Sequence, residues 1–118
     1  MKSKAIKLYG IKNCDTVKKA RRWLDQHGLE YQFHDVRLDG LDASQINSWR
    51  KQIDWETLVN KRSTTWKQLD DATKTKINAD TVNDVLLAHP TLIKRPVLEC
   101  SGQVHVGFKD SDYATFFD

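Results

Sequence analysis

The first 36 residues change their hydrophobic period twice, and this change limits the folds that are open to the chain. Residues 5–9 form a short apolar run that ends at Gly10, as a strand does. From Asp15 onward the apolar residues recur at helical spacing: Val17, Ala20 and Leu24. Residues 31–36 then alternate in polarity, as a second strand would. A strand, one helix and a strand in so short a stretch predict a β-α-β unit with parallel strands.

The middle of the chain is predicted to be helical. Asp42 and Gln45 have the spacing of a helix cap and precede apolar residues at helical positions. Residues 54–79 are polar and weakly periodic, which indicates short helices and turns. Residues 81–84 repeat the capping pattern and open a helix that Pro90 closes. The residues expected on one face of that helix are Val82, Val85, Leu86 and His89.

The last part of the chain predicts a hairpin and a final helix. Residues 97–100 and 103–106 are short apolar runs, and the Ser-Gly pair between them favours an antiparallel turn. Residues 110–117 predict a helix. Pro96, directly before the first of these strands, indicates a cis peptide bond or a rigid turn.

The predicted order of elements is therefore β-α-β, a helical stretch and then β-β-α. This is the order of a thioredoxin-like α/β fold with a helical insertion between its halves. We expect a single domain over residues 1–118, with residues of about 41–80 as the insertion.

The composition excludes several classes of protein. Hydrophobic residues make up 39% and charged residues 30% of 118 residues, as in a globular chain. The net charge of +3 is small and the basic residues are spread out, so no direct contact with nucleic acid is expected. No stretch approaches the ~20 apolar residues of a membrane span, and no apolar segment follows the charged start as in a signal peptide. We expect a monomeric cytoplasmic protein without membrane contact.

Cys14 lies between the first predicted strand and the first predicted helix. At a helix N-terminus, unpaired backbone N–H groups and the helix dipole both favour an anion. Lys12 and Lys18 add positive charge nearby. Because the thiolate is the reactive form of cysteine, this location favours a nucleophile. The alternative is a small buried residue, and the polar neighbours of Cys14 argue against burial.

The other candidate residues are weighed in the same way. Cys100 ends an apolar run and is expected to be structural, although it could resolve an oxidised Cys14. Arg95 precedes Pro96 and, in this fold, would lie near the Cys14 loop, where its guanidinium could hold an oxyanion. Arg62 could do the same or be an ordinary solvated side chain on a polar stretch. The four histidines lack metal-ligand spacing, so no metal site is expected: His27, His34, His89 and His105. The four tryptophans are expected in the core: Trp23, Trp49, Trp55 and Trp66.

Three segments resemble signatures of one family. The chain is similar to the glutaredoxin-coupled arsenate reductase superfamily, in its YffB-like branch beside the Spx/MgsR regulators. The first segment resembles the active-site segment of that family, the second resembles its HP-x-LI-x-RP signature, and the third resembles the VG-[FY] of the Spx and YffB branches. They are Tyr9–Ala20 (YGIKNCDTVKKA), His89–Val97 (HPTLIKRPV) and Val106–Phe108 (VGF). The resemblance covers nearly the whole chain and implies a thioredoxin-like fold with a helical insertion.

The resemblance also implies roles for particular residues. In the arsenate reductases of the family, one cysteine attacks arsenate and three arginines hold the oxyanion. Cys14 matches the cysteine, and Arg95 matches one arginine. The other two arginines would fall near Asn60 and Gly107, and Arg62, two residues after Asn60, is the candidate substitute. Losing two charge-assisted contacts of ~1.5–3 kcal/mol each would weaken arsenate binding by orders of magnitude, so robust arsenate reduction is not expected.

The function implied by the resemblance is that of a monothiol oxidoreductase linked to glutathione or glutaredoxin. The Cys14 thiolate would be the nucleophile, and Arg95, Arg62 and Lys12 would bind an oxyanion or a glutathione carboxylate. Pro96 would be a structural residue beside the site. Glutathione would act as co-substrate, with no bound cofactor.

The alternative is an Spx-like regulator that binds the α-subunit of RNA polymerase. The Spx regulators carry a Cys-x-x-Cys switch, and Val17 occupies the second of those positions. An internal switch of that kind is therefore not expected, whereas binding to the polymerase does not depend on it.

Overall fold

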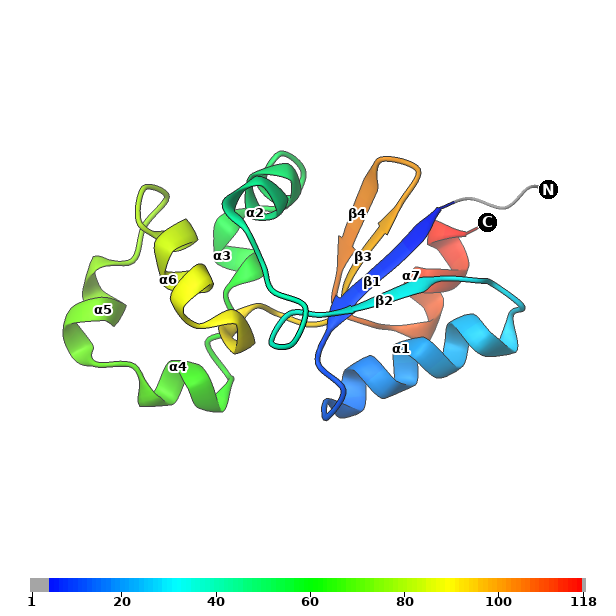
Figure 1. Ribbon diagram of the computed structural model, residues 1–118, viewed down its shortest axis with the longest axis horizontal. Helices are drawn as coiled ribbons and strands as arrows, with labels where there is room; N and C mark the ends of the chain where they lie inside the picture. The colour runs from blue at the N-terminus through cyan, green and yellow to red at the C-terminus, as the bar shows by residue number, and fades with distance from the viewer. Residues whose placement is uncertain (1–4, 118) are drawn as a thin grey trace. The chain divides into compact units, whose positions relative to one another are not determined.

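The computed structural model describes residues 5–117 and divides the chain into two compact units (Figure 1). The first unit comprises the residues up to Asp35 together with those from Arg95 onward. The second unit is Val36–Lys94, and the expected insertion of residues 41–80 lies within it.

The first unit contains one mixed sheet with the strand order β2-β1-β3-β4. The parallel pair of β1 with β2 and the antiparallel hairpin of β3 with β4 confirm the predicted pairings. The structure adds an antiparallel pair of β1 with β3, which joins the two halves of the sheet. The elements are β1 (Ile6–Gly10), α1 (Asp15–Gln26), β2 (Gln32–Asp35), β3 (Val97–Cys100), β4 (Gln103–Val106) and α7 (Asp110–Phe116). This is the thioredoxin-like α/β arrangement with a helical insertion.

Two local features of the first unit confirm the turn predictions. Ser101 and Gly102 have φ angles of 53° and 81°, so the β3–β4 hairpin closes through two left-handed residues, as a primed turn requires. The Arg95–Pro96 peptide is cis, which is one of the two predicted options.

Helices α1 and α7 pack on one face of the sheet and form the core of the first unit (Figure 1). Alternate residues of β1 and β3 point to that face, because side chains alternate along a strand. The buried members of this core are Ile6, Leu8, Ala20, Trp23, Leu24, Leu98, Cys100 and Tyr113. Cys100 is only 4% exposed, which confirms its predicted place in the core.

Tyr113 is the largest α7 side chain in this core. Its ring contacts Trp23 and Phe108 edge-on, with centroids 5.4 and 4.7 Å apart. The hydroxyl is buried and has no hydrogen-bond partner among residues 5–117. Burying a hydroxyl without a partner costs about 1–3 kcal/mol in proteins, so this group opposes folding.

Tyr113→Phe is therefore expected to raise the free energy of unfolding by about 1 kcal/mol in urea titrations. The variant keeps the ring contacts and removes only the unpaired hydroxyl. A lower free energy of unfolding would show that the hydroxyl has a favourable partner, and would contradict the prediction.

Tyr113→Phe is also expected to change how the free energy of unfolding depends on pH in alkaline solution. Burial raises the pKa of Tyr113 above its usual value of ~10. Above pH ~10 the unfolded chain loses this phenol proton while the folded chain keeps it, so the free energy of unfolding falls as the pH rises. Below pH ~10 both states are protonated and the group has no effect. Unfolding measured from pH 8 to 11 should show a shallower fall for Tyr113→Phe than for the unsubstituted protein.

The second unit is built from short helices, as the polar middle of the sequence predicted. They are α2 (Ala43–Arg50), α3 (Trp55–Leu58), α4 (Thr64–Gln68), α5 (Asp71–Lys76), α6 (Val82–Ala88) and the 3₁₀ turn η1 (Pro90–Leu92). Their fully buried side chains include Ile46, Trp49, Leu58, Val82, Leu86 and Leu92. Within the described part of the chain, every helix is too short or too polar to span a membrane.

Helix α2 begins with the predicted capping box. The Asp42 side chain accepts a hydrogen bond from the Gln45 backbone at 2.8 Å, and the Gln45 side chain accepts one from the Asp42 backbone at 3.0 Å. Arg50, the last residue of α2, donates to Asn83 of α6 at 3.1 Å, and Asn83 donates to Asn47 at 2.7 Å. Polar contacts therefore join α2 to α6 beside the buried core of this unit.

Two expectations for the second unit need correction. Helix α6 follows Thr81, but the Thr81 hydroxyl does not cap it; the hydroxyl donates to Lys76 and accepts from Asn78. An upstream turn thus competes for the capping group. Only Trp23 and Trp49 of the four tryptophans lie in the core, whereas the other two, Trp55 and Trp66, are partly exposed.

Candidate functional site

Cys14 is the N-cap residue of α1, as its place in the sequence predicted. Its backbone is extended (φ −116°, ψ 123°), and its carbonyl accepts the first helical hydrogen bond, from Lys18, at 2.9 Å. The thiol is partly exposed and takes the position that Ser, Thr, Asp or Asn usually fills, without itself capping the backbone. A sulfur in this place lies beside the unpaired N–H groups of the first turn, where negative charge is stabilised.

The loop that carries Cys14 is fixed at both of its ends. Gly10 closes β1 so near to α1 that a Cβ at this position would lie 2.7 Å from Val17 Cγ2. Ile11 is buried, and the Lys12 backbone N–H donates to Asp35 Oδ2 at 3.2 Å. The start of α1 is thus held against the ends of both β1 and β2.

Arg95 and Pro96 lie at the same edge of the sheet as this loop. Tyr9 pairs with Val97 in antiparallel register, so the residues that follow β1 run beside those that precede β3. Pro96 is buried, and its carbonyl accepts a hydrogen bond from Gly107 at 2.8 Å. Arg95 is partly exposed. The topology therefore brings Cys14, Arg95 and Pro96 to one edge, as predicted, while their chemical roles stay predictions.

Lys12 and Arg62 fall in different units. Lys12 belongs to the Cys14 loop, and its side chain is exposed. Arg62 belongs to the second unit, in the turn between α3 and α4, where it is exposed. Its backbone N–H donates to Asn60 Oδ1 at 3.0 Å. The role of Arg62 stays a prediction.

Asn60 and Gly107, near which the resemblance places the two unmatched arginines, each have a role in the local backbone structure. Asn60 organises the turn into α4: its side chain accepts from Arg62, and its carbonyl accepts from the Ser63 hydroxyl at 2.7 Å. Gly107 has a φ of 86°, a left-handed conformation that a longer side chain adopts only with strain. Asn60 is therefore a turn residue, and the left-handed backbone at position 107 favours a glycine.

Cys100 lies at the opposite end of the sheet from Cys14. It pairs with Ile6 at the start of β1, whereas the Cys14 loop follows Gly10 at the end of that strand. A rise of ~3.3 Å per residue separates the two ends of β1 by about 13 Å. Because a disulfide requires Cα atoms within about 7 Å, Cys100 cannot resolve an oxidised Cys14 in this fold.

The sequence reasoning missed Asp35. Asp35 lay within the predicted strand of residues 31–36 and had no role of its own, whereas the structure buries its carboxylate and bonds it to the Cys14 loop. The available signal was an acidic residue at the end of a strand whose parallel neighbour leads into that loop. Among residues 5–117, no three His, Cys, Asp or Glu side chains gather as a metal site would need.

Comparisons with known proteins agree with the resemblance read from the sequence. A model of the ArsC family matches residues 9–116. An uncharacterised protein of Haemophilus influenzae is 47% identical over 112 residues, which cover 95% of this chain and 98% of that protein. The global transcriptional regulator Spx of Streptococcus pyogenes is 23% identical over 113 residues, which cover 94% of this chain and 84% of the regulator.

Solved structures give the same relationship. The YFFB (PA3664) protein is 44% identical with a TM-score of 0.90, over 94% of this chain and 97% of that one. An arsenate reductase (ArsC) related protein from Brucella melitensis is 42% identical with a TM-score of 0.78, over 100% of this chain and 98% of that one.

Proposed function

This chain belongs to the ArsC family, as a relative of YFFB and more distantly of the Spx regulators, and from that premise we propose that it is a monothiol oxidoreductase linked to glutathione or glutaredoxin. One observation carries the proposal: Cys14, with a partly exposed side chain, is the N-cap residue of α1. A helix N-terminus is a place where negative charge is favoured, and the thiolate is the nucleophilic form of cysteine. Since Cys100 lies at the other end of β1, the oxidised sulfur is released by a thiol from another molecule.

The proposed cycle consists of two thiol–disulfide exchanges, here with a glutathione mixed disulfide as substrate. The Cys14 thiolate attacks the glutathione sulfur, the substrate S–S bond breaks, and the substrate leaves as a thiolate that takes a proton from water. A second glutathione, as thiolate, then attacks the glutathione sulfur bound to Cys14. This step forms oxidised glutathione and restores the Cys14 thiolate, so one substrate disulfide is reduced for every glutathione disulfide formed.

The cations of the site would bind the carboxylates of glutathione. Arg95 lies at the same sheet edge as Cys14, and Lys12 lies two residues before it. A guanidinium suits a carboxylate because it offers several donors in one plane. Arg62 would contribute only if it reaches the same ligand, so Arg62→Ala separates its contribution from that of Arg95→Ala.

The test is turnover of a small glutathione mixed disulfide with glutathione as reductant. We expect the protein to accelerate the reaction, and Arg95→Ala to raise KM for the glutathione mixed disulfide more than it lowers kcat. A protein that does not accelerate the exchange, with or without added glutaredoxin, would contradict the proposed activity.

Arsenate is expected to be a poor substrate. By the resemblance, two arginines of the family's arsenate reductases would fall near Asn60 and Gly107, where this chain does not match them, and each missing charge-assisted contact removes ~1.5–3 kcal/mol of binding. Two such losses lower arsenate affinity by at least about 100-fold. Arsenate should therefore fail to compete with glutathione exchange at millimolar concentration, and clear competition would contradict this prediction.

The second candidate is a regulator that binds the α-subunit of RNA polymerase. The similarity to Spx, which covers most of this chain, favours it. Val17 in place of a second cysteine makes such binding independent of an internal disulfide. A pull-down with the C-terminal domain of the α-subunit tests this, and absence of binding under both reducing and oxidising conditions would exclude it.

A further inference from the structure

Asp35 is a buried carboxylate with no part in the exchange described above. It ends β2 and is 1% exposed, and it is the one charged side chain buried to this degree among residues 5–117. Placing an ionised carboxylate in a protein interior is costly unless hydrogen bonds compensate it. The burial of the Asp35 carboxylate, in the same unit as Cys14, therefore needs a specific explanation.

The carboxylate is bound to the loop that leads to Cys14. Gly10 and Asp35 are partners in the parallel register of β1 and β2, so both strands end at the same edge of the sheet. From there Asp35 Oδ2 accepts a hydrogen bond from the Lys12 backbone N–H at 3.2 Å. Lys12 precedes the N-cap residue by two positions, and the bond spans 23 residues of sequence.

Asp35 could affect Cys14 through its negative charge or through its hydrogen bond to the loop, and the sign of the charge distinguishes these two roles. A negative charge near Cys14 disfavours the thiolate by like-charge repulsion. An acid at this place therefore does not serve the reactivity of Cys14 through its charge. It serves through the hydrogen bond, which fixes the loop and with it the position of the sulfur at the start of α1.

We infer that Asp35 is a positioning residue for Cys14, which acts by holding the Lys12 amide. This inference rests on the proposed role of Cys14 as a nucleophile. It adds that the reactivity of the sulfur depends on an acceptor atom at position 35 rather than on a charge there.

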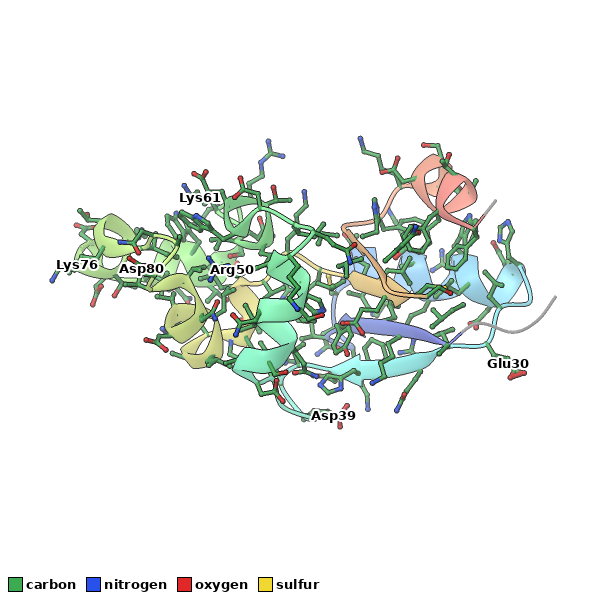
Figure 2. The ribbon with its side chains drawn as sticks, turned by 90° about the horizontal axis from the view of Figure 1, so that it is seen from above. Glu30, Asp39, Arg50, Lys61, Lys76 and Asp80 are labelled. Atoms are coloured by element: carbon green, nitrogen blue, oxygen red, sulfur yellow. The ribbon has the colours of Figure 1, made fainter. Side chains whose placement is uncertain are left out.

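The experiment measures the rate of Cys14 alkylation by iodoacetamide between pH 5 and 9 in the full chain, with Cys100→Ser as the common background. Asp35→Ala removes the acceptor and should slow alkylation at pH 7 by about 10-fold, the equivalent of one hydrogen bond to a charged group. Asp35→Asn keeps an acceptor oxygen without the charge, and should stay within about 3-fold of the parent rate. Glu30→Ala removes an exposed acid before β2 (Figure 2) and serves as the matched control, expected to leave the rate unchanged.

Hydrogen exchange of the Lys12 amide provides the second readout. We expect protection in the parent and in Asp35→Asn, and rapid exchange in Asp35→Ala. Equal alkylation rates in the parent and in Asp35→Ala would overturn the inference. It would also be overturned if the plot of alkylation rate against pH for Asp35→Asn were shifted along the pH axis with its maximum rate unchanged, because such a shift is the effect of a charge. If Asp35→Ala does not fold, the Asp35→Asn profile and its Lys12 protection still decide between acceptor and charge.

Neither readout requires glutathione. Failure of the glutathione reaction with normal alkylation would reject the proposed function and leave the role of Asp35 intact. Normal glutathione turnover in Asp35→Ala would reject the positioning role and leave the proposed function intact.

Discussion

Intact-mass spectrometry after incubation with oxidised glutathione is expected to show one glutathionyl group on the protein and none on Cys14→Ser. The thiol at position 14 is partly exposed at a helix N-terminus, whereas Cys100 is 4% exposed within the core. Attack on a disulfide requires an accessible thiolate, and only the first of the two sulfurs meets that requirement. The expected effect is complete loss of modification on a single substitution of sulfur by oxygen.

The matched control is Cys100→Ser, which should still accept one glutathionyl group. Its folding must be verified by circular dichroism, because a hydroxyl replaces a buried sulfur in the core. If modification persists in Cys14→Ser, or disappears in a folded Cys100→Ser, the reactive sulfur is not that of Cys14. Either result would reject the proposed mechanism.

Gly10→Ala is expected to lower the free energy of unfolding by about 1–3 kcal/mol and to slow the reaction of Cys14. The added Cβ would lie 2.7 Å from Val17 Cγ2 and 3.1 Å from Cγ1, which is closer than carbon atoms approach one another without displacement. Val17 is fully buried in the first turn of α1, so it has little room to yield. Relief of the contact moves the start of α1 and therefore also moves Cys14, its N-cap residue.

The double variant Gly10→Ala/Val17→Ala tests this explanation. Removing the two methyl groups of Val17 removes the clash, so the loss in the double variant should be smaller than the sum of the two single losses by at least about 0.5 kcal/mol. Urea unfolding and the alkylation rate of Cys14 measure the two consequences. Additive losses, or a Gly10→Ala protein as stable as the parent, would contradict the steric account.

The features that the sequence predicted correctly depend on neighbouring residues. The capping box of α2 needs only Asp42 and Gln45, and the β3–β4 hairpin needs only Ser101 and Gly102 between two apolar runs. The N-cap position of Cys14 likewise follows from the period change after β1. Such signals are local in the chain, and few alternative contacts compete with them.

The features that it missed depend on residues far apart in the chain or on competing partners. The bond from Lys12 to Asp35 needs the register of β1 against β2, which no local pattern specifies. The Thr81 hydroxyl had a capping position available but bonds to residues of the preceding turn. Trp66 is partly exposed beside the ammonium group of Lys61, 5.5 Å from its ring centroid, a cation–π contact that hydrophobicity alone does not predict.

The pairing of β1 with β3 has a consequence for synthesis on the ribosome. The side chains of Tyr9 and Glu99 are hydrogen-bonded across these strands although they are 90 residues apart. Strand β1, which leads to Cys14, can therefore pair with β3 only after most of the chain has been translated. The second unit, Val36–Lys94, is continuous in sequence and is complete earlier in synthesis. A nascent chain that ends before Arg95 would already contain Cys14 but not β3, so the sheet edge that brings Arg95 to the side of the Cys14 loop forms only when translation is nearly finished.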